Sequence, residues 1–330
     1  MATKGGAKPE KAQVKVTRQK TGDAISVQEF MSLHRPKGDL ILQVGKERVS
    51  VTSLDRVYWP DEKLTKFDLL CYYLRVADHI MPFLKDRPAI LQRWPRGINA
   101  PMFFQQDLES APAFIKSERL TTQEGKQVDY AVYSTVGSLL HFVNLGSIEQ
   151  HPWHSSLKHL SKPDWIAIDL DPKKAPWDNV LQTALVVKEV ADEIGLKAFA
   201  KTSGSSGIHI YVPLKPTNEY ENVAEFAKLL AGEVARRAPS IATVERTLAR
   251  RKPTQVYVDW MQNARGKSLA SAFTARAKAK APVSMPLGWK QISEGVKITD
   301  FTITNVPDLL KKKRDEWSDF FKERHTLKFD

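Results

Sequence analysis

The chain has 330 residues, of which 42% are hydrophobic and 27% charged, so it can bury one large core or two smaller ones. Its formal net charge is +12 and its pI about 9.5, a balance that favours a polyanionic partner without naming one. No apolar run approaches the roughly 20 residues of a membrane span, which argues against a membrane protein. The single cysteine, Cys71, excludes an internal disulfide and is typical of a reducing cytosol.

The N-terminal segment differs in composition from the rest of the chain. The first 23 residues are rich in Lys, Gly, Ala and Gln, and no apolar stretch follows their charges. Such a composition cannot bury enough apolar surface to fold alone, and it is not that of a secretory signal. We therefore expect a basic, disordered tail over residues 1–38 and a folded, cytoplasmic region of two lobes over 39–330.

Apolar periodicity predicts regular elements along the folded region. A helix is expected over 65–81, with a capping box of Thr65 and Asp68, and Pro82 should end it. The other expected elements are strands at 39–44, 48–51, 165–170, 197–201, 208–212 and 255–260, a helix at 179–194 capped by Asp178, a helix at 221–237, and a helix from Pro307 with Trp317 and Phe320 on its apolar side. Helices and strands mix without a regular strand–helix repeat, which predicts a mixed α/β (α+β) fold with a substantial antiparallel part.

The stretch DWIAIDLDP, residues 164–172, places two carboxylates at the end of an apolar strand. Side chains alternate along a strand, so Asp169 and Asp171 become neighbours on one face while Ile168 and Leu170 point to the other. Pro172 ends the strand because it has no N–H to donate. Two like charges this close destabilise the fold unless a cation lies between them.

A loop of small residues precedes the strand predicted at 208–212. Glycine lets backbone N–H groups approach an anion closely, and the hydroxyls of Ser203 and Ser205 beside Gly204 add donors. Alone, such a loop is more often a plain tight turn, and no Gly-Lys-Ser/Thr follows it as in a Walker loop. Because His209 follows on the strand and the two carboxylates are near in the sequence, we interpret the loop as a phosphate cradle.

A third carboxylate, Asp259, ends an apolar strand inside a basic segment. From Arg246 to Lys280 there are nine Lys or Arg residues and this one acid, with aromatic residues among them, a mixture that suits phosphates and stacked bases. Three aspartates from two strands could hold a pair of divalent cations, and oxygen-only ligands select magnesium or manganese over zinc. Two such ions ~3.5–4 Å apart promote in-line phosphoryl transfer. A turn or capping role for each aspartate is the competing interpretation.

Aromatic and histidine residues upstream suggest further features. Phe103 and Phe104 could pack in the core or offer a stacking platform for a terminal base. His151, His154 and His159 could suggest zinc, but their spacing is not that of a known zinc finger. His151 could instead line a polar cleft.

In this order and at these separations, the motifs resemble the polymerase domain of bacterial ligase D, a member of the archaeo-eukaryotic primase superfamily. The resemblance runs from about Arg48 to Leu310 on LDRVYWP (54–60), RWP (93–95), FF (103–104), EQHPW (149–153), IDLDP (168–172), TSGSSGIH (202–209) and VDW (258–260). It implies a core of two interleaved lobes, with mixed or antiparallel sheets flanked by helices and the active site between the lobes. It also implies DNA-templated gap filling and end extension in non-homologous end joining, often with ribonucleotides and manganese.

The resemblance assigns roles to individual residues. Two magnesium or manganese ions would be bound by the catalytic residues Asp169, Asp171 and Asp259. The incoming nucleotide would be bound by Ser203, Gly204, Ser205, His209, Arg276 and, beside the catalytic centre, His151. DNA would be bound by Arg56, Lys66, Arg93, Phe103, Phe104, Arg251 and Lys252, with the phenylalanines stacking on the template and Arg56 and Lys66 holding the 5′-phosphate across the gap.

Two positions depart from the family pattern. Ser206 and Gln92 stand where the family commonly has lysines that bind phosphate. Each departure removes a cation, so weaker affinity for the nucleotide or the 5′-phosphate is expected unless Lys201, Arg93 or Lys252 compensates.

The expected activity is that of a DNA-directed nucleotidyltransferase acting on DNA ends or gapped duplexes with NTP or dNTP, with Ku and a DNA ligase as partners. No Lys-x-Asp-Gly ligase motif occurs, so strand sealing must come from elsewhere. Two alternatives stay open. A metal-dependent nuclease could use the same aspartates, and a non-catalytic module could bind DNA ends without them.

Overall fold

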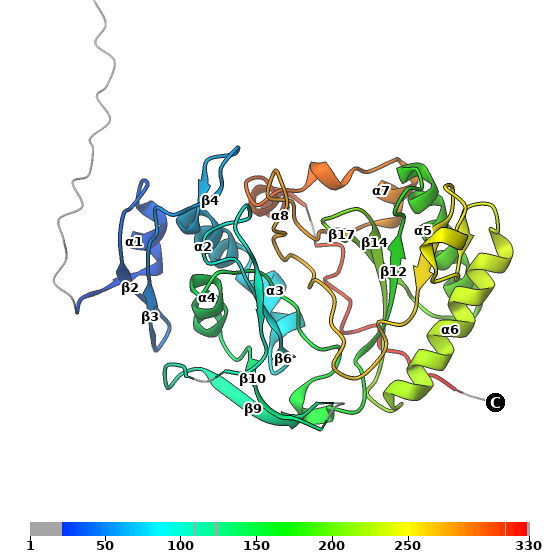
Figure 1. Ribbon diagram of the computed structural model, residues 1–330, viewed down its shortest axis with the longest axis horizontal. Coiled ribbons are helices and arrows are strands. Elements are labelled where there is room, and N and C mark those ends of the chain that lie inside the picture. Colours follow the sequence, from blue (N-terminus) through cyan, green and yellow to red (C-terminus); the bar gives the residue numbers. More distant parts are fainter. Residues whose placement is uncertain (1–21, 109, 123–124, 314, 329–330) are drawn as a thin grey trace, which may run out of the picture.

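The computed structural model describes residues 22–108, 110–122, 125–313 and 315–328. Two parts lie side by side in Figure 1: an N-terminal part of small sheets and helices, and a part built on a six-stranded sheet. The mixed α/β class predicted from the sequence is confirmed. Within the described ranges, no helix is long and apolar enough to cross a membrane.

The six-stranded sheet contains every strand expected after residue 164. Its strands, in spatial order, are β15 (Ala242–Thr243), β16 (Val256–Asp259), β12 (Trp165–Asp171), β14 (Ile208–Pro213), β13 (Phe199–Thr202) and β17 (Pro286–Leu287). All neighbouring pairs are antiparallel except β15 and β16, which run parallel. The expectation of a substantial antiparallel part is therefore confirmed.

The two faces of this sheet are covered differently. The long helices α5 (Trp177–Glu193) and α6 (Tyr220–Arg237) pack together on one face (Figure 1). On the other face Trp165 stacks on Tyr211, with ring centroids 5.5 Å apart, and Phe320 contacts both rings. Because strand side chains alternate, Asp169 lies on this second face together with Trp165. The aromatic cluster thus shares a face with the candidate metal ligands.

Within the described residues, the N-terminal part consists of small sheets and four helices. Its sheets are β1–β2–β3 (Ala24–Ser26, Leu40–Val44, Glu47–Val51), β4–β5 (Val57–Trp59, Leu64–Thr65), β6–β10–β9 (Pro88–Ala89, Gln127–Val132, Lys116–Thr121) and β11–β7–β8 (Ser147–Glu149, Leu91–Arg93, Phe103–Gln105), and its helices after residue 60 are α2 (Lys66–Arg75), α3 (Ala77–Leu84) and α4 (Val136–Asn144). Phe83 of α3 packs on Phe320 and Trp317, so this part joins the six-stranded sheet through the aromatic cluster.

Short elements complete the chain: α7 (Trp289–Ser293), α8 (Val306–Lys312) and 3-10 helices at Leu157–His159, Leu248–Arg250 and Ile298–Asp300.

The end of the disordered N-terminal tail was predicted too far along the chain. Residues 1–21 lie outside the described residues, but strand β1 and helix α1 (Val27–Ser32) lie within the segment expected to be disordered. Ser26 and Glu29 form a capping box at the start of α1, and β1 pairs in parallel with β2. The low-complexity composition ends before Asp23. The short apolar runs after it are sufficient to form regular structure once a neighbouring strand supplies hydrogen bonds.

The helix expected over 65–81 is two helices. The capping box of Thr65 and Asp68 is confirmed, but the chain breaks at Val76, between α2 and α3. Pro82 does not end the helix and lies inside α3. A short helix loses only one backbone hydrogen bond to a proline, and burial of its apolar face offsets that loss.

Two further boundaries differ from the prediction. Helix α5 begins at Trp177 after Pro176, so Asp178 belongs to its first turn and is not the cap. Helix α8 ends at Lys312, so Trp317 and Phe320 lie beyond it in turns. Both aromatic residues are nevertheless buried, which shows that their apolar character reflected core packing and not helix periodicity.

Candidate active site

Four polar side chains form a row across the middle of the six-stranded sheet. The register pairs Asp259 of β16 with Asp169 of β12, Asp169 with His209 of β14, and His209 with Lys201 of β13. Directly opposed residues on neighbouring strands have Cβ atoms about 4.5–5.5 Å apart and point to the same face. The four strands therefore bring together a carboxylate pair, an imidazole and an amine that are up to 90 residues apart in the sequence.

The three aspartates make up the acidic cluster. Asp171 lies two residues beyond Asp169 on the same strand and so on the same face. Burial, followed by the charges of Asp259 and Asp171, raises the pKa of Asp169 to about 7. The predicted carboxylate repulsion is therefore present in the fold, and a cation bound among these groups would relieve it.

The donor chemistry of the acidic cluster fits a hard divalent cation. Carboxylate oxygens are the ligands that magnesium and manganese prefer. As they stand, the side chains are turned apart: Asp259 accepts hydrogen bonds from the Met261 N–H and the Gln262 amide, both at 2.8 Å, and Asp171 lies 3.7 Å from the Lys173 ammonium. Within the described residues, no three Asp, Glu, His or Cys side chains are grouped closely enough to hold a metal in these positions. A metal bound by Asp259 would thus share its carboxylate oxygens with the Met261 N–H and the Gln262 amide or displace them.

The loop between β13 and β14 is organised around one hydroxyl. Ser203 Oγ accepts hydrogen bonds from the Ser205 and Gly207 N–H groups at 3.1 and 3.0 Å, which leaves its own hydrogen to donate. Gly207 allows close approach to β12, since an added Cβ would lie 2.0 Å from the Leu170 carbonyl oxygen. Ser203 and His209 therefore present their donors at the same end of the sheet as Asp169, and His209 Nε2 lies 3.5 Å from the Asp169 carboxylate.

Lys201 is a site residue that the sequence reasoning mentioned only as a compensating cation. Its side chain is fully buried, and its amine contacts His209 Nδ1, the Ala270 carbonyl and Ser284 Oγ, each at 2.7 Å. Burial and the charge of Lys201 lower the pKa of His209 well below its usual value, so the imidazole is neutral. Lys201 thus orients the ring of His209 and cannot itself reach a triphosphate as a surface lysine would. The pairing of β13 with β14 places it opposite His209, and the sequence alone carried no signal for that pairing.

A second buried group links His151 and Arg276 through Glu149. Glu149 Oε2 lies 2.9 Å from His151 Nε2 and 3.0 Å from Arg276 Nε. Arg276 also donates to the backbone carbonyl of Ser203. His151, Arg276 and the serine loop are therefore brought together as expected. Glu149, which lies in the EQHPW motif, was not among the expected site residues.

A basic cluster lies in the N-terminal part. Lys66 at the start of α2 is 3% exposed, and burial, the charge of Arg56 and, more weakly, that of Arg93 lower its pKa to about 8, against a raising effect of Asp39. Arg56 donates to the Pro95 carbonyl at 2.6 Å and Arg93 to the Leu145 carbonyl at 2.8 Å. The three cations therefore share one region and repel one another, which is an arrangement that an anion would stabilise.

The phenylalanine pair is on the surface. Phe103 and Phe104 on β8 are 45% and 63% exposed, so core packing is not their role. The Arg93 guanidinium lies over the Phe103 ring, 5.0 Å from its centroid. Gln92, where the family has a lysine, pairs with Phe104 across β7 and β8. Arg93 of the basic cluster thus lies on the same small sheet as the exposed rings.

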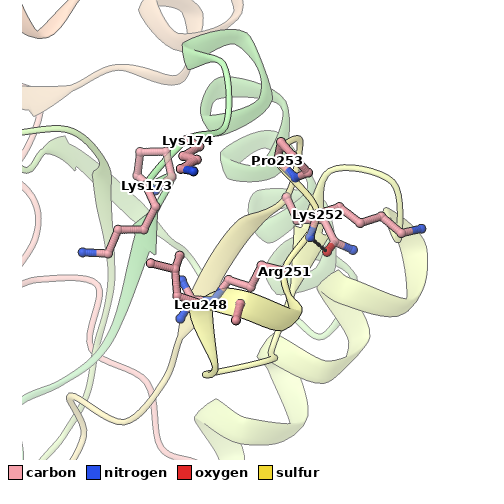
Figure 2. Close-up of a pocket in the computed structure, with 9 residues that line it drawn as sticks. Lys173, Lys174, Leu248, Arg251, Lys252 and Pro253 are labelled. Carbon is pink, nitrogen blue, oxygen red and sulfur yellow. Dashed lines mark hydrogen bonds between the residues drawn. The ribbon is translucent and has the colours of Figure 1, made fainter.

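A basic pocket of about 470 Å³ lies beside the end of β12, between Lys173 and Lys174 on one strand end and the 248–253 loop (Figure 2). Lys252 lines it with its amine exposed. Arg251 is engaged within its own loop, since it donates to the Glu245 and Arg246 carbonyls and stacks on Tyr257 at 4.1 Å. A DNA contact by Lys252 stays a prediction, and one by Arg251 would require it to leave these partners.

Comparison with known proteins places this arrangement in a family. Residues 65–317 match the family model described as LigD, primase-polymerase domain. The chain is 30% identical over 295 residues to the multifunctional non-homologous end joining protein LigD of Pseudomonas aeruginosa, covering 84% of this chain and 34% of that protein. It is 31% identical over 278 residues to the bifunctional non-homologous end joining protein LigD of Bacillus subtilis, covering 83% and 44%. The chain therefore spans between a third and a half of these relatives.

A solved structure with the same fold is the polymerase domain from Mycobacterium tuberculosis ligase D in complex with DNA. The TM-score is 0.78 at 24% sequence identity, over 85% of this chain and all of that chain. This likeness establishes the archaeo-eukaryotic primase fold expected from the sequence.

Proposed function

Because the chain belongs to the LigD primase-polymerase domain family, we propose that it is a DNA-templated nucleotidyltransferase that extends primer ends and fills gaps during non-homologous end joining. The observation that carries the proposal is the row of Asp259, Asp169 and His209, with the Ser203 loop directly beside it. It unites oxygen ligands for divalent metals with neutral and cationic donors for phosphate. Nucleotidyl transfer needs both within one site.

The reaction joins the primer 3′-oxygen to the α-phosphorus of a nucleoside triphosphate as the bond to pyrophosphate breaks. Two magnesium or manganese ions held by Asp169, Asp171 and Asp259 would make the 3′-hydroxyl more acidic and neutralise the leaving pyrophosphate. The hydroxyl of Ser203, His209 and the Arg276 guanidinium would bind the phosphates, and His151 would lie beside them. These donors orient the triphosphate for in-line attack.

The N-terminal part would hold the DNA. Lys66, Arg56 and Arg93 would bind the 5′-phosphate across a gap, where its two negative charges relieve the repulsion among the cations. Phe103 and Phe104 would stack on the template base next to the break. Lys252 would contact the strand that passes the basic pocket.

Ribonucleotide preference and association with Ku and a DNA ligase belong to the same proposal. The relatives are named for non-homologous end joining, and they are longer than this chain. Sealing would fall to a ligase supplied by another part of a longer protein or by a separate one.

Primer extension on a gapped duplex tests the proposal. Substrates with and without a 5′-phosphate are incubated with ribo- or deoxynucleotides in magnesium, manganese or EDTA. We expect metal-dependent lengthening that is greater with ribonucleotides and with the 5′-phosphate. Shortening of the labelled strand would indicate a nuclease instead, and DNA binding with neither change would indicate a non-catalytic end-binding module.

A further inference from the structure

Glu149 is the buried carboxylate closest to the nucleotide-binding side chains. It ends strand β11 and is 4% exposed. One oxygen, Oε2, contacts both His151 and Arg276, while Oε1 accepts a hydrogen bond from the Ala277 N–H at 2.9 Å. The carboxylate thus binds the side chain of Arg276 and the backbone that follows it.

The carboxylate is held in its charged form. Burial alone would raise the pKa of Glu149, but the hydrogen bond from His151, the charge of Arg276 and the Ala277 N–H together lower it to about 2. An ionised carboxylate only accepts hydrogen bonds, so the proton of His151 belongs on Nε2. This leaves Nδ1 of His151 as a hydrogen-bond acceptor, which can meet a donor such as a sugar hydroxyl but not a phosphate oxygen. Glu149 therefore selects both the tautomer and the orientation of His151.

The same contact fixes the path of Arg276. From Glu149 the guanidinium reaches across to the Ser203 carbonyl. It passes over Gly204, which has a φ of +68° and no room for a side chain, since an added Cβ would lie 2.6 Å from Arg276 Cγ. The position of Arg276 is thus set from two sides, by a carboxylate in the N-terminal part and by the loop of the six-stranded sheet.

Strand β11 also connects this contact to the exposed rings. Glu149 pairs with Gln92 of β7, and Gln92 pairs with Phe104 of β8. One row of three strands therefore leads from the carboxylate that holds Arg276 to the aromatic pair proposed to stack on the template. Displacement at one end of so small a sheet is transmitted to the other.

We propose that Glu149 is a positioning residue for the incoming nucleotide: its carboxylate presents the Arg276 guanidinium to the triphosphate, holds the His151 ring beside it, and keeps both in register with strand β8. This inference rests on the proposed polymerase function. It assigns Glu149 no contact with the substrate. Its loss should weaken nucleotide binding much more than it slows the chemical step.

The test compares Glu149→Gln with Asp164→Asn. Asp164 also forms a buried ion pair, 2.6 Å from Arg87, but lies at the opposite end of β12 from the acidic cluster. Both substitutions remove one buried negative charge and keep the shape of the side chain, so both should lower the melting temperature. Only Glu149→Gln should raise KM for the nucleotide, by about 10-fold or more, with kcat reduced less than fivefold.

Equilibrium binding of a fluorescent ATP analogue in the presence of magnesium gives a second readout. The affinity should fall for Glu149→Gln in parallel with the rise in KM and stay within twofold of the wild type for Asp164→Asn. If Glu149→Gln does not fold, Glu149→Asp keeps the charge, withdraws the carboxylate by one carbon, and should raise KM in the same way.

An unchanged KM and affinity in the folded Glu149 variant, or an equal loss in Asp164→Asn, would overturn the inference. If the wild-type protein does not extend primers at all, the proposed function itself fails. The wild-type control thus separates the two failures.

Discussion

The acidic and basic clusters of this protein both bury like charges close together, but the charges are negative in one cluster and positive in the other. In the acidic cluster, burial and like charges raise the pKa of Asp169 to about 7, and in the basic cluster burial and like charges lower the pKa of Lys66 to about 8. Each cluster therefore destabilises the ligand-free fold. Each would be stabilised by a ligand of the opposite charge, a divalent cation in one and a phosphate in the other.

The difference between the clusters lies in how rigidly they are built. The acidic cluster is set by the register of β12 and β16, which keeps the backbone positions of its carboxylates together while their side chains can still rotate. The basic cluster comes from a loop, a helix start and a short strand, and Arg56 and Arg93 find backbone carbonyl partners. We therefore expect the acidic cluster to control chemistry and the basic cluster to tune affinity.

The largest effect is expected in the acidic cluster. Asp171→Ala should reduce nucleotide incorporation about a thousandfold or more, because it removes a proposed metal ligand for the chemical step. Affinity for gapped DNA, measured by fluorescence anisotropy, should change less than threefold. Asp178→Asn, an exposed aspartate in the first turn of α5, is the control and should keep full activity. Full incorporation by Asp171→Ala would remove the basis for the proposed function.

The second effect is a pH-dependent stability of the metal-free protein. Since the folded-state pKa of Asp169 is raised from 3.8 to about 7, the folded state binds more protons than the unfolded state between these values. The free energy of unfolding should therefore fall as pH rises from 4 to 7. Each pKa unit corresponds to about 1.4 kcal/mol, so with a side chain that is 23% exposed we expect a loss of roughly 2 kcal/mol.

Asp169→Asn should remove this loss. In EDTA its melting temperature should exceed that of the wild type at pH 8 but not at pH 4.5, and magnesium should stabilise only the wild type. Asp61→Asn, on an exposed turn, should follow the wild type at every pH. If the melting temperatures of Asp169→Asn and the wild type differed by the same amount at every pH from 4.5 to 8, the carboxylates would not repel one another.

The third prediction concerns the basic cluster. Lys66→Met keeps the aliphatic stem and removes the charge, and it should reduce the preference for a 5′-phosphorylated gap about tenfold without changing binding to the 5′-hydroxyl form. In the wild type the preference should decline as pH rises above about 8, because the pKa of Lys66 lies there and only the protonated amine attracts phosphate. The exposed Lys63→Met is the matched control. A preference unaffected by Lys66→Met would place the 5′-phosphate elsewhere.

The smallest effect is expected at the exposed rings. Phe104→Ala should weaken binding to a gapped duplex about fivefold, since stacking on one base is worth about 1–3 kcal/mol. The control is Leu229→Ala, which removes an apolar side chain of α6 that is itself 66% exposed. Anisotropy titrations should show no change in its DNA affinity. If Phe104→Ala changed the DNA affinity no more than Leu229→Ala does, the result would argue against stacking.

Much of the candidate site could be predicted from short-range patterns. The alternation in DWIAIDLDP placed Asp169 and Asp171 on one face, and the register agrees with the faces predicted for His209 and Asp259. Glycines in the 203–207 loop were predicted to let the backbone approach an anion, which stays a prediction; the structure shows that Gly204 and Gly207 let Arg276 and β12 approach the loop closely. Boundaries were less predictable: the break at Val76 and the helix through Pro82 were missed, since burial overrode the local signals.

By itself, the sequence determined which residues share a face of a strand, because alternation depends only on consecutive residues. It could not determine which strands pair, and so it did not place Lys201 beside His209 or Glu149 beside Arg276. Those contacts join residues 8 and 127 positions apart and depend on register and on the packing of the two parts. Burial then decided their chemistry, because the same lysine or glutamate on the surface would be a solvated charge with no neighbour to position.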